Sequence, residues 1–120
     1  MFFYKTAQQE IDIEYLTDPN SAANNIYTSY STGEDIPIWY SNQAVEEGTD
    51  ATQKTGPVVG DPTEFHVYRI VWTKYYTAFY VDGEFQYRYY DNVPSEPGAF
   101  IFNNWANGDP CELCIKHERI

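Results

Sequence analysis

The stretch Glu10-Ile11-Asp12-Ile13-Glu14 places three carboxylates in alternation with two isoleucines. Alternation with a period of two is typical of a strand that has one face in the core and the other in solvent. We therefore expect the two isoleucines and Tyr15 to enter the core, while the three acids form a row on the opposite face. Like charges in a row repel each other and do not favour sheet formation. The row therefore predicts a sheet-borne site for acid–base chemistry, with a solvated acidic edge strand as the alternative.

Composition narrows the class of protein. The chain has 120 residues, enough for one modest domain, and its aromatic content of 18% favours strands. The net charge of −11 argues against binding to nucleic acid or to anionic membranes, because both need cationic contacts. A neutral polysaccharide would not be repelled, and we expect a monomer. There is neither the apolar run of a membrane helix nor the pattern of a signal peptide.

Strand patterns recur along the chain, and helix patterns are scarce. We expect strands at 2–5, 9–16, 36–42, 64–73, 76–82, 84–90 and 99–104, with long polar loops at 18–35 and 43–63. The pair Asp82-Gly83 predicts a hairpin turn. This pattern predicts an all-β fold, an antiparallel sandwich or jelly roll. Because the first strand starts at Met1 and the tail lacks a strand pattern, we expect the sandwich to be incomplete.

Several blocks of sequence follow one another along the chain: Gln9–Tyr15, Phe65–Thr73, Phe79–Gly83, Asn92–Pro94 and Phe102–Gly108. In this order they resemble the blocks of one known family, glycoside hydrolase family 16, and most closely its fungal concanavalin A-like lectin/glucanase branch. The resemblance implies a concanavalin A-like jelly roll of two antiparallel sheets, with substrate in a concave cleft. It also implies a partial catalytic domain at 1–110, an atypical tail at 111–120, and a secreted or cell-wall location.

The resemblance assigns a role to each acid and implies a retaining endo-glycosidase that acts on a β-glucan without a cofactor. Glu10 would be the nucleophile, Glu14 the general acid and then the general base, and Asp12 the residue that manages their charge. Strand residues four apart have Cα atoms about 13 Å apart. Their carboxyl groups must therefore lean together to reach the roughly 5–5.5 Å of a retaining pair. Like charges should raise at least one pKa among the three.

Five further residues are candidates for substrate binding. Trp39 and Tyr40 are adjacent on an expected strand and should point to opposite faces, and the resemblance favours Tyr40 in the cleft. Asn103 and Trp105 share a face, and by resemblance they flank the sugar beside the scissile bond. His66 is a weaker candidate, since a hydrogen-bonded, partly buried histidine explains it as well.

Other readings of the same residues stay open. The acidic row could bind calcium, but it lacks the wrapping loop of calcium sites, so we expect no metal. Cys111 and Cys114 form a Cys-x-x-C pair for which we expect no role. A non-catalytic carbohydrate-binding sandwich would use the same cleft without turnover. An inactive fragment of such an enzyme is the third possibility, because family members are usually longer at both ends.

Overall fold

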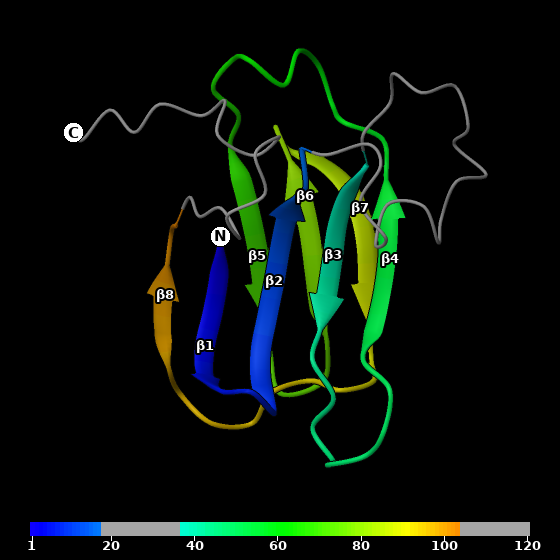
Figure 1. Ribbon diagram of the computed structural model, residues 1–120, viewed down its shortest axis with the longest axis vertical. Helices are drawn as coiled ribbons and strands as arrows, with labels where there is room; N and C mark the ends of the chain where they lie inside the picture. The colour runs from blue at the N-terminus through cyan, green and yellow to red at the C-terminus, as the bar shows by residue number, and fades with distance from the viewer. Residues whose placement is uncertain (18–36, 104–120) are drawn as a thin grey trace.

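The computed structural model describes residues 1–17 and 37–103, and these ranges form eight strands in two layers (Figure 1). The strands are β1 (Phe2–Thr6), β2 (Gln9–Tyr15), β3 (Ile38–Asn42), β4 (Thr52–Gly56), β5 (Tyr68–Trp72), β6 (Thr77–Val81), β7 (Glu84–Tyr89) and β8 (Ala99–Ile101). A five-stranded sheet has the order β4-β3-β2-β1-β8, and a three-stranded sheet has the order β5-β6-β7. Every pair of neighbours is antiparallel. The all-β sandwich of two antiparallel sheets is therefore confirmed. In the described ranges, no helix suits a membrane crossing in length and hydropathy.

The core lies between the sheets and is built from alternate residues of the strands. Its buried members are Phe3, Ile11, Ile13, Ile38, Tyr40, Phe79, Val81 and Tyr89. The two isoleucines of β2 enter this core as expected, with exposures of 0% and 4%. Tyr15 was also expected there, but it is 38% exposed. It is the last residue of β2, so its ring lies at the margin of the sandwich.

Tyr40 belongs to the core, and the prediction that it lines a cleft is wrong. It pairs with Ile13 across β2 and β3, and directly paired residues point to the same face of a sheet. Its ring lies 5.5 Å from the rings of both Phe79 and Tyr87 in the opposite sheet. Trp39, the preceding residue, consequently points to the other face, where the acids lie.

Two strand boundaries differ from the expectation. β4 lies inside the range 43–63 that was expected to be a loop, because its pairing with β3 depends on backbone bonds and not on apolar side chains. The hydroxyl of Tyr87 supports it by donating to the carbonyl oxygen of Thr55 at 2.6 Å. The strand expected over 64–73 is regular only in β5. Before β5, the Val67 N–H donates to the side chain of Asp82 at 2.7 Å.

The hairpin expected at Asp82-Gly83 is confirmed. These residues join β6 to β7, with φ values of 51° and 83°. Positive φ at both central positions is the requirement of a type I′ turn, which matches the twist of the strands on either side.

The core contains one polar group whose removal should stabilise the protein. The hydroxyl of Tyr40 is buried and has no hydrogen-bond partner among the described residues. Burying an unpaired hydroxyl costs about 1–3 kcal/mol. We therefore expect Tyr40→Phe to raise the free energy of unfolding in urea by about 1 kcal/mol.

Tyr89→Phe is the matched control. The Tyr89 hydroxyl is also buried, but it donates to the carbonyl oxygen of Tyr40 at 2.9 Å. Its removal should lower the free energy of unfolding by about 1 kcal/mol. A loss of stability in both variants would contradict our assignment of an unpaired hydroxyl to Tyr40.

Candidate functional site

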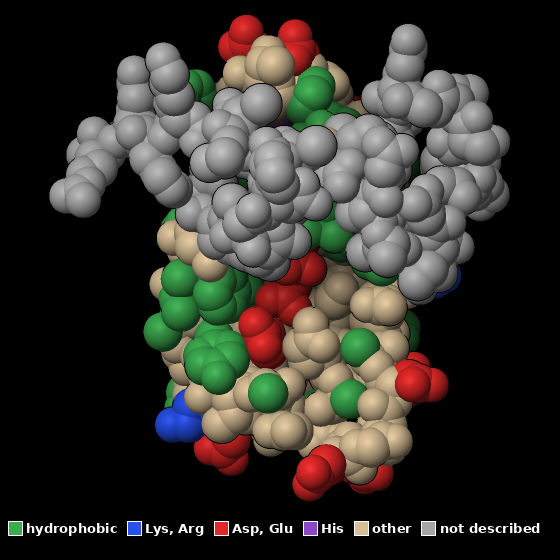
Figure 2. Space-filling view, in the orientation of Figure 1, with side chains coloured by type: hydrophobic (Ala, Val, Ile, Leu, Met, Phe, Trp, Pro, Cys, Tyr) green, Lys and Arg blue, Asp and Glu red, His purple; other side chains and the backbone are tan. Residues whose placement is uncertain are grey.

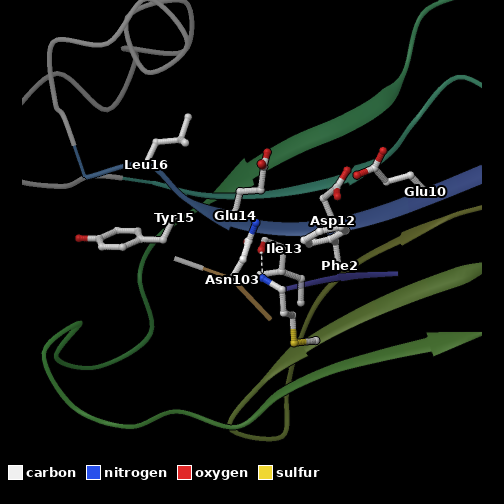
Figure 3. Close-up of a pocket in the computed structure, with 9 residues that line it drawn as sticks. Phe2, Glu10, Asp12, Ile13, Glu14, Tyr15, Leu16 and Asn103 are labelled. Carbon is white, nitrogen blue, oxygen red and sulfur yellow. Dashed lines mark hydrogen bonds between the residues drawn. The ribbon is translucent and has the colours of Figure 1, made fainter. Parts of the chain in front are cut away.

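The three acids of β2 line one open pocket. Because they alternate with the core isoleucines, Glu10, Asp12 and Glu14 share the outer face of the five-stranded sheet. The pocket has a volume of about 310 Å³, and Phe2 and Asn103 are also in its wall (Figure 3). In the space-filling view, acidic side chains gather in one patch on this face, over β2 (Figure 2). The structure thus brings the predicted row together on an accessible surface.

Neighbouring strands place aromatic side chains beside the acids. Phe2 of β1 pairs with Asp12, and Trp39 of β3 pairs with Glu14. Directly paired residues share a face and lie about 4.5–5.5 Å apart at Cβ. The acidic row therefore has one aromatic neighbour on each side, in the two strands that border β2.

Asp12 is the most deeply placed of the three acids, with an exposure of 4%. Burial is the largest cause that raises the pKa of its carboxyl group, from the ordinary 3.8 to about 7, and the neighbouring Glu10 carboxylate adds to the rise. A hydrogen bond opposes this rise, because Nε2 of Gln43 donates to Oδ2 of Asp12 at 2.7 Å. Asp12 is therefore the acid of the row that keeps a proton near neutral pH.

The carboxyl groups of Glu10 and Asp12 interact with each other. Burial raises the pKa of Glu10, while the hydrogen bond between its side chain and that of Asp12 lowers it. The same bond raises the pKa of Asp12. The two carboxyl groups therefore titrate as an interacting pair. Figure 3 shows the carboxyl group of Glu10 turned toward Asp12.

Glu14 lies at the other end of the row. Partial burial at the pocket raises its pKa, and the Asp12 carboxyl adds to this, while the N-terminal ammonium of Met1 acts in the opposite direction. That ammonium donates to the carbonyl oxygen of Ile13 at 2.8 Å. Glu10 and Glu14 thus lie on either side of a buried acid, and the pKa of each is raised from its ordinary value.

The other candidates from the sequence are divided between this site and the rest of the molecule. Asn103 lines the pocket, and Trp39 lies on its face of the sheet. His66 does not line the pocket, and both its ring nitrogens are engaged. Nδ1 lies 2.6 Å from Oδ2 of Asp82, and Nε2 lies 2.7 Å from the carbonyl oxygen of Asp61. The geometry therefore gives no support to His66 as a substrate contact.

Three residues singled out in the sequence lie outside the described ranges, and the sequence did not indicate the contact of Gln43 with Asp12. Trp105, Cys111 and Cys114 lie outside the described residues. Among residues 1–17 and 37–103, no group of three or more His, Cys, Asp or Glu side chains is arranged to hold a metal ion. Gln43 was not a candidate, because it falls in a range expected to be a loop. Only the pairing of β3 with β2 shows that it reaches Asp12.

The raised pKa of Asp12 gives a prediction for stability. Between pH 4 and 7 the folded state binds more protons at this residue than the unfolded state does, so stability falls as the pH rises through this window. Asn cannot ionise. We therefore expect the free energy of unfolding of Asp12→Asn to fall less between pH 4 and pH 8, by on the order of 2 kcal/mol relative to the wild type.

Urea denaturation at a series of pH values measures this difference. Asp50→Asn, which changes an exposed carboxylate, is the control and should keep the wild-type dependence on pH. If the free energy of unfolding of Asp12→Asn had the same dependence on pH as that of the wild type, the carboxyl group of Asp12 would ionise as easily in the folded wild-type chain as in the unfolded one.

Comparisons with known proteins agree with the motif blocks. The model of glycosyl hydrolases family 16 matches residues 1–113. A beta-glucanase of Acetivibrio thermocellus is 35% identical over 97 residues, and a beta-glucanase from a strain of the same species is 34% identical over the same length. Each match covers 80% of this chain and 24% of the relative, so the chain spans about a quarter of the length of these curated relatives. No solved structure matches the chain. The branch within the family stays a prediction, but the family is shown, and this chain belongs to glycosyl hydrolases family 16.

Proposed function

We propose that the chain provides the acid-bearing floor of a retaining glycoside hydrolase that cleaves a β-glucan. The observation that supports this most directly is the row of three acids on one open face, and the pKa of each acid is raised from its ordinary value. The relatives named beta-glucanase support the choice of substrate. A polysaccharide substrate also suits an acidic protein whose pocket has an aromatic wall.

The first step of the proposed reaction uses the two outer acids. A carboxylate oxygen of Glu10 attacks the anomeric carbon and forms a glycosyl ester, while the bond from that carbon to the leaving oxygen breaks. Glu14 gives its proton to this oxygen, so that the leaving sugar departs as an alcohol. The raised pKa of Glu14 suits a proton donor at mildly acidic to neutral pH.

The second step restores the enzyme. Once Glu10 is an ester, its negative charge is gone, and the repulsion between Glu10 and Glu14 is removed. The ionised Glu14 then takes a proton from a water molecule, whose oxygen attacks the anomeric carbon and releases Glu10. A sugar hydroxyl in place of this water gives transglycosylation with the same residues. The acids need no metal or cofactor for these steps.

Asn103 and Trp39 are the proposed sugar contacts within the described residues. Asn103 lines the pocket and has an amide that can pair with a sugar hydroxyl. Trp39 pairs with Glu14, but the residue is only 6% exposed, so little of its ring is open to stack on a pyranose face. Trp105 stays a third proposed contact. An extracellular location belongs to the same proposal, because a β-glucan of a cell wall lies outside the cell.

The two outer acids can be tested separately. We expect Glu10→Gln to lower the release of reducing ends from lichenan or laminarin by at least about a thousandfold, because no covalent intermediate can form. Glu14→Gln should lower it by about 10²–10⁴-fold. With a glucoside that has an activated aryl leaving group, Glu14→Gln should release the aryl group in a rapid first turnover, because that group departs without a proton, and should then turn over slowly, because Glu14 no longer activates the water.

Glu46→Gln is the control, since it changes an exposed acid outside the pocket and should have wild-type activity. Equal rates for Glu10→Gln and the wild type would remove the proposed nucleophile. Binding of glucan by a wild-type chain that releases no reducing ends would favour the non-catalytic carbohydrate-binding alternative.

A further inference from the structure

Gln43 bridges the two interacting acids of the row. It is the residue that follows β3, and its backbone N–H donates to the carbonyl oxygen of Glu10 at 3.0 Å. This bond continues the pairing of β2 with β3 one residue beyond the pair Ile11 and Asn42. The side chain of Gln43 reaches the acidic face, where Nε2 donates to Oδ2 of Asp12 at 2.7 Å. One residue thus contacts the backbone of Glu10 and the carboxyl group of Asp12.

The contact with Gln43 distinguishes the two oxygens of Asp12. In a neutral carboxyl group the carbonyl oxygen accepts hydrogen bonds better than the hydroxyl oxygen does. An amide that donates to Oδ2 therefore favours Oδ2 as the carbonyl oxygen and Oδ1 as the protonated one. The Oδ1 proton is then the one available for the hydrogen bond between Asp12 and Glu10.

The charged groups around Asp12 do not fix its orientation in this way. Glu10 and Glu14 from β2 favour its neutral form, and the Met1 ammonium, beside β1, favours its ionised form. From β3, Ser41 pairs with Asp12 in the ladder. The amide of Gln43 adds a directed bond to one named oxygen, which a charge at a distance cannot supply.

We propose that Gln43 is a positioning residue, which orients the carboxyl group of Asp12 so that its proton is shared with Glu10. Its meaning for catalysis rests on the proposed function, in which Glu10 is the nucleophile. An Asp12 that donates to one oxygen of Glu10 keeps the Glu10 carboxylate ionised and in place, with its other oxygen free for the sugar. Gln43 itself does not touch the reacting atoms.

Gln43→Met tests the proposal, because Met has a similar length and volume but no donor. The first readout needs no activity. In a titration of the side-chain carboxyl carbons by ¹³C NMR, the Asp12 signal is assigned by its loss in Asp12→Asn. Since the Gln43 bond favours ionised Asp12, its removal should move the midpoint of Asp12 upward by about one pH unit.

The control is Gln86→Met. Gln86 lies on β7, and its Nε2 donates to the carbonyl oxygen of Glu84 in the same strand at 3.2 Å, so the Asp12 midpoint should not move. If Gln43→Met does not fold, Gln43→Asn retracts the same amide by one methylene and should produce an upward shift of the same sign.

The second readout is the hydrolysis of lichenan. We expect Gln43→Met to lower kcat about tenfold with KM within a factor of two. A midpoint that is unchanged in the folded variants would overturn the proposal, whatever the activity. A shifted midpoint in a chain without wild-type turnover would support the positioning of Asp12 by Gln43, while the proposed function would fail.

Discussion

The pairing of β2 with β3 is the constraint on which the site depends. Its register sets Ile13 opposite Tyr40, and Glu14 opposite Trp39. Side chains alternate between the two faces of a sheet, so a slip by one residue would send the acids into the core and the isoleucines to the surface. Tyr40 packs closely against Phe79 in the core. Acidic side chains moved into the core by a slip could not make such contacts, so this packing opposes the slip. The core thus fixes the face on which the acids lie.

A buried polar network locks the two sheets to each other behind the acids. The side chain of Asn42, at the end of β3, accepts from the Thr77 hydroxyl of β6 at 2.9 Å. It also donates to the carbonyl oxygen of Asp91 at 3.0 Å. A network whose polar groups are satisfied specifies a unique arrangement, because any shift leaves a buried group unpaired. At the other side of the core, the ring of Phe3 lies 4.4 Å from that of Trp72.

The acidic row lowers the stability of the sandwich. Burial raises the pKa of Asp12 to about 7, and burial and like charge also raise the pKa of Glu14. In the unfolded chain both carboxyl groups ionise freely at neutral pH. In the folded chain their ionisation is unfavourable, which lowers the free energy of unfolding. The hydrogen bond from Gln43 to Asp12 offsets part of this cost, because it lowers the pKa of Asp12. A site of this kind costs stability at neutral pH, which is the usual relation between a reactive cluster and the scaffold that supports it.

The sequence alone determined the features that depend on neighbouring residues. Alternation in β2 separated the acids from Ile11 and Ile13, and Asp82-Gly83 specified its turn, because both signals are local. The tertiary structure decided the features that depend on distant partners. It placed Tyr40 in the core with Trp39 on the acidic face, made a strand of the polar segment Thr52–Gly56, and brought Gln43 to Asp12. The physical reason is that a period of two shows that two faces differ, whereas the register between strands, set by packing far along the chain, decides which face is which and what lies beside it.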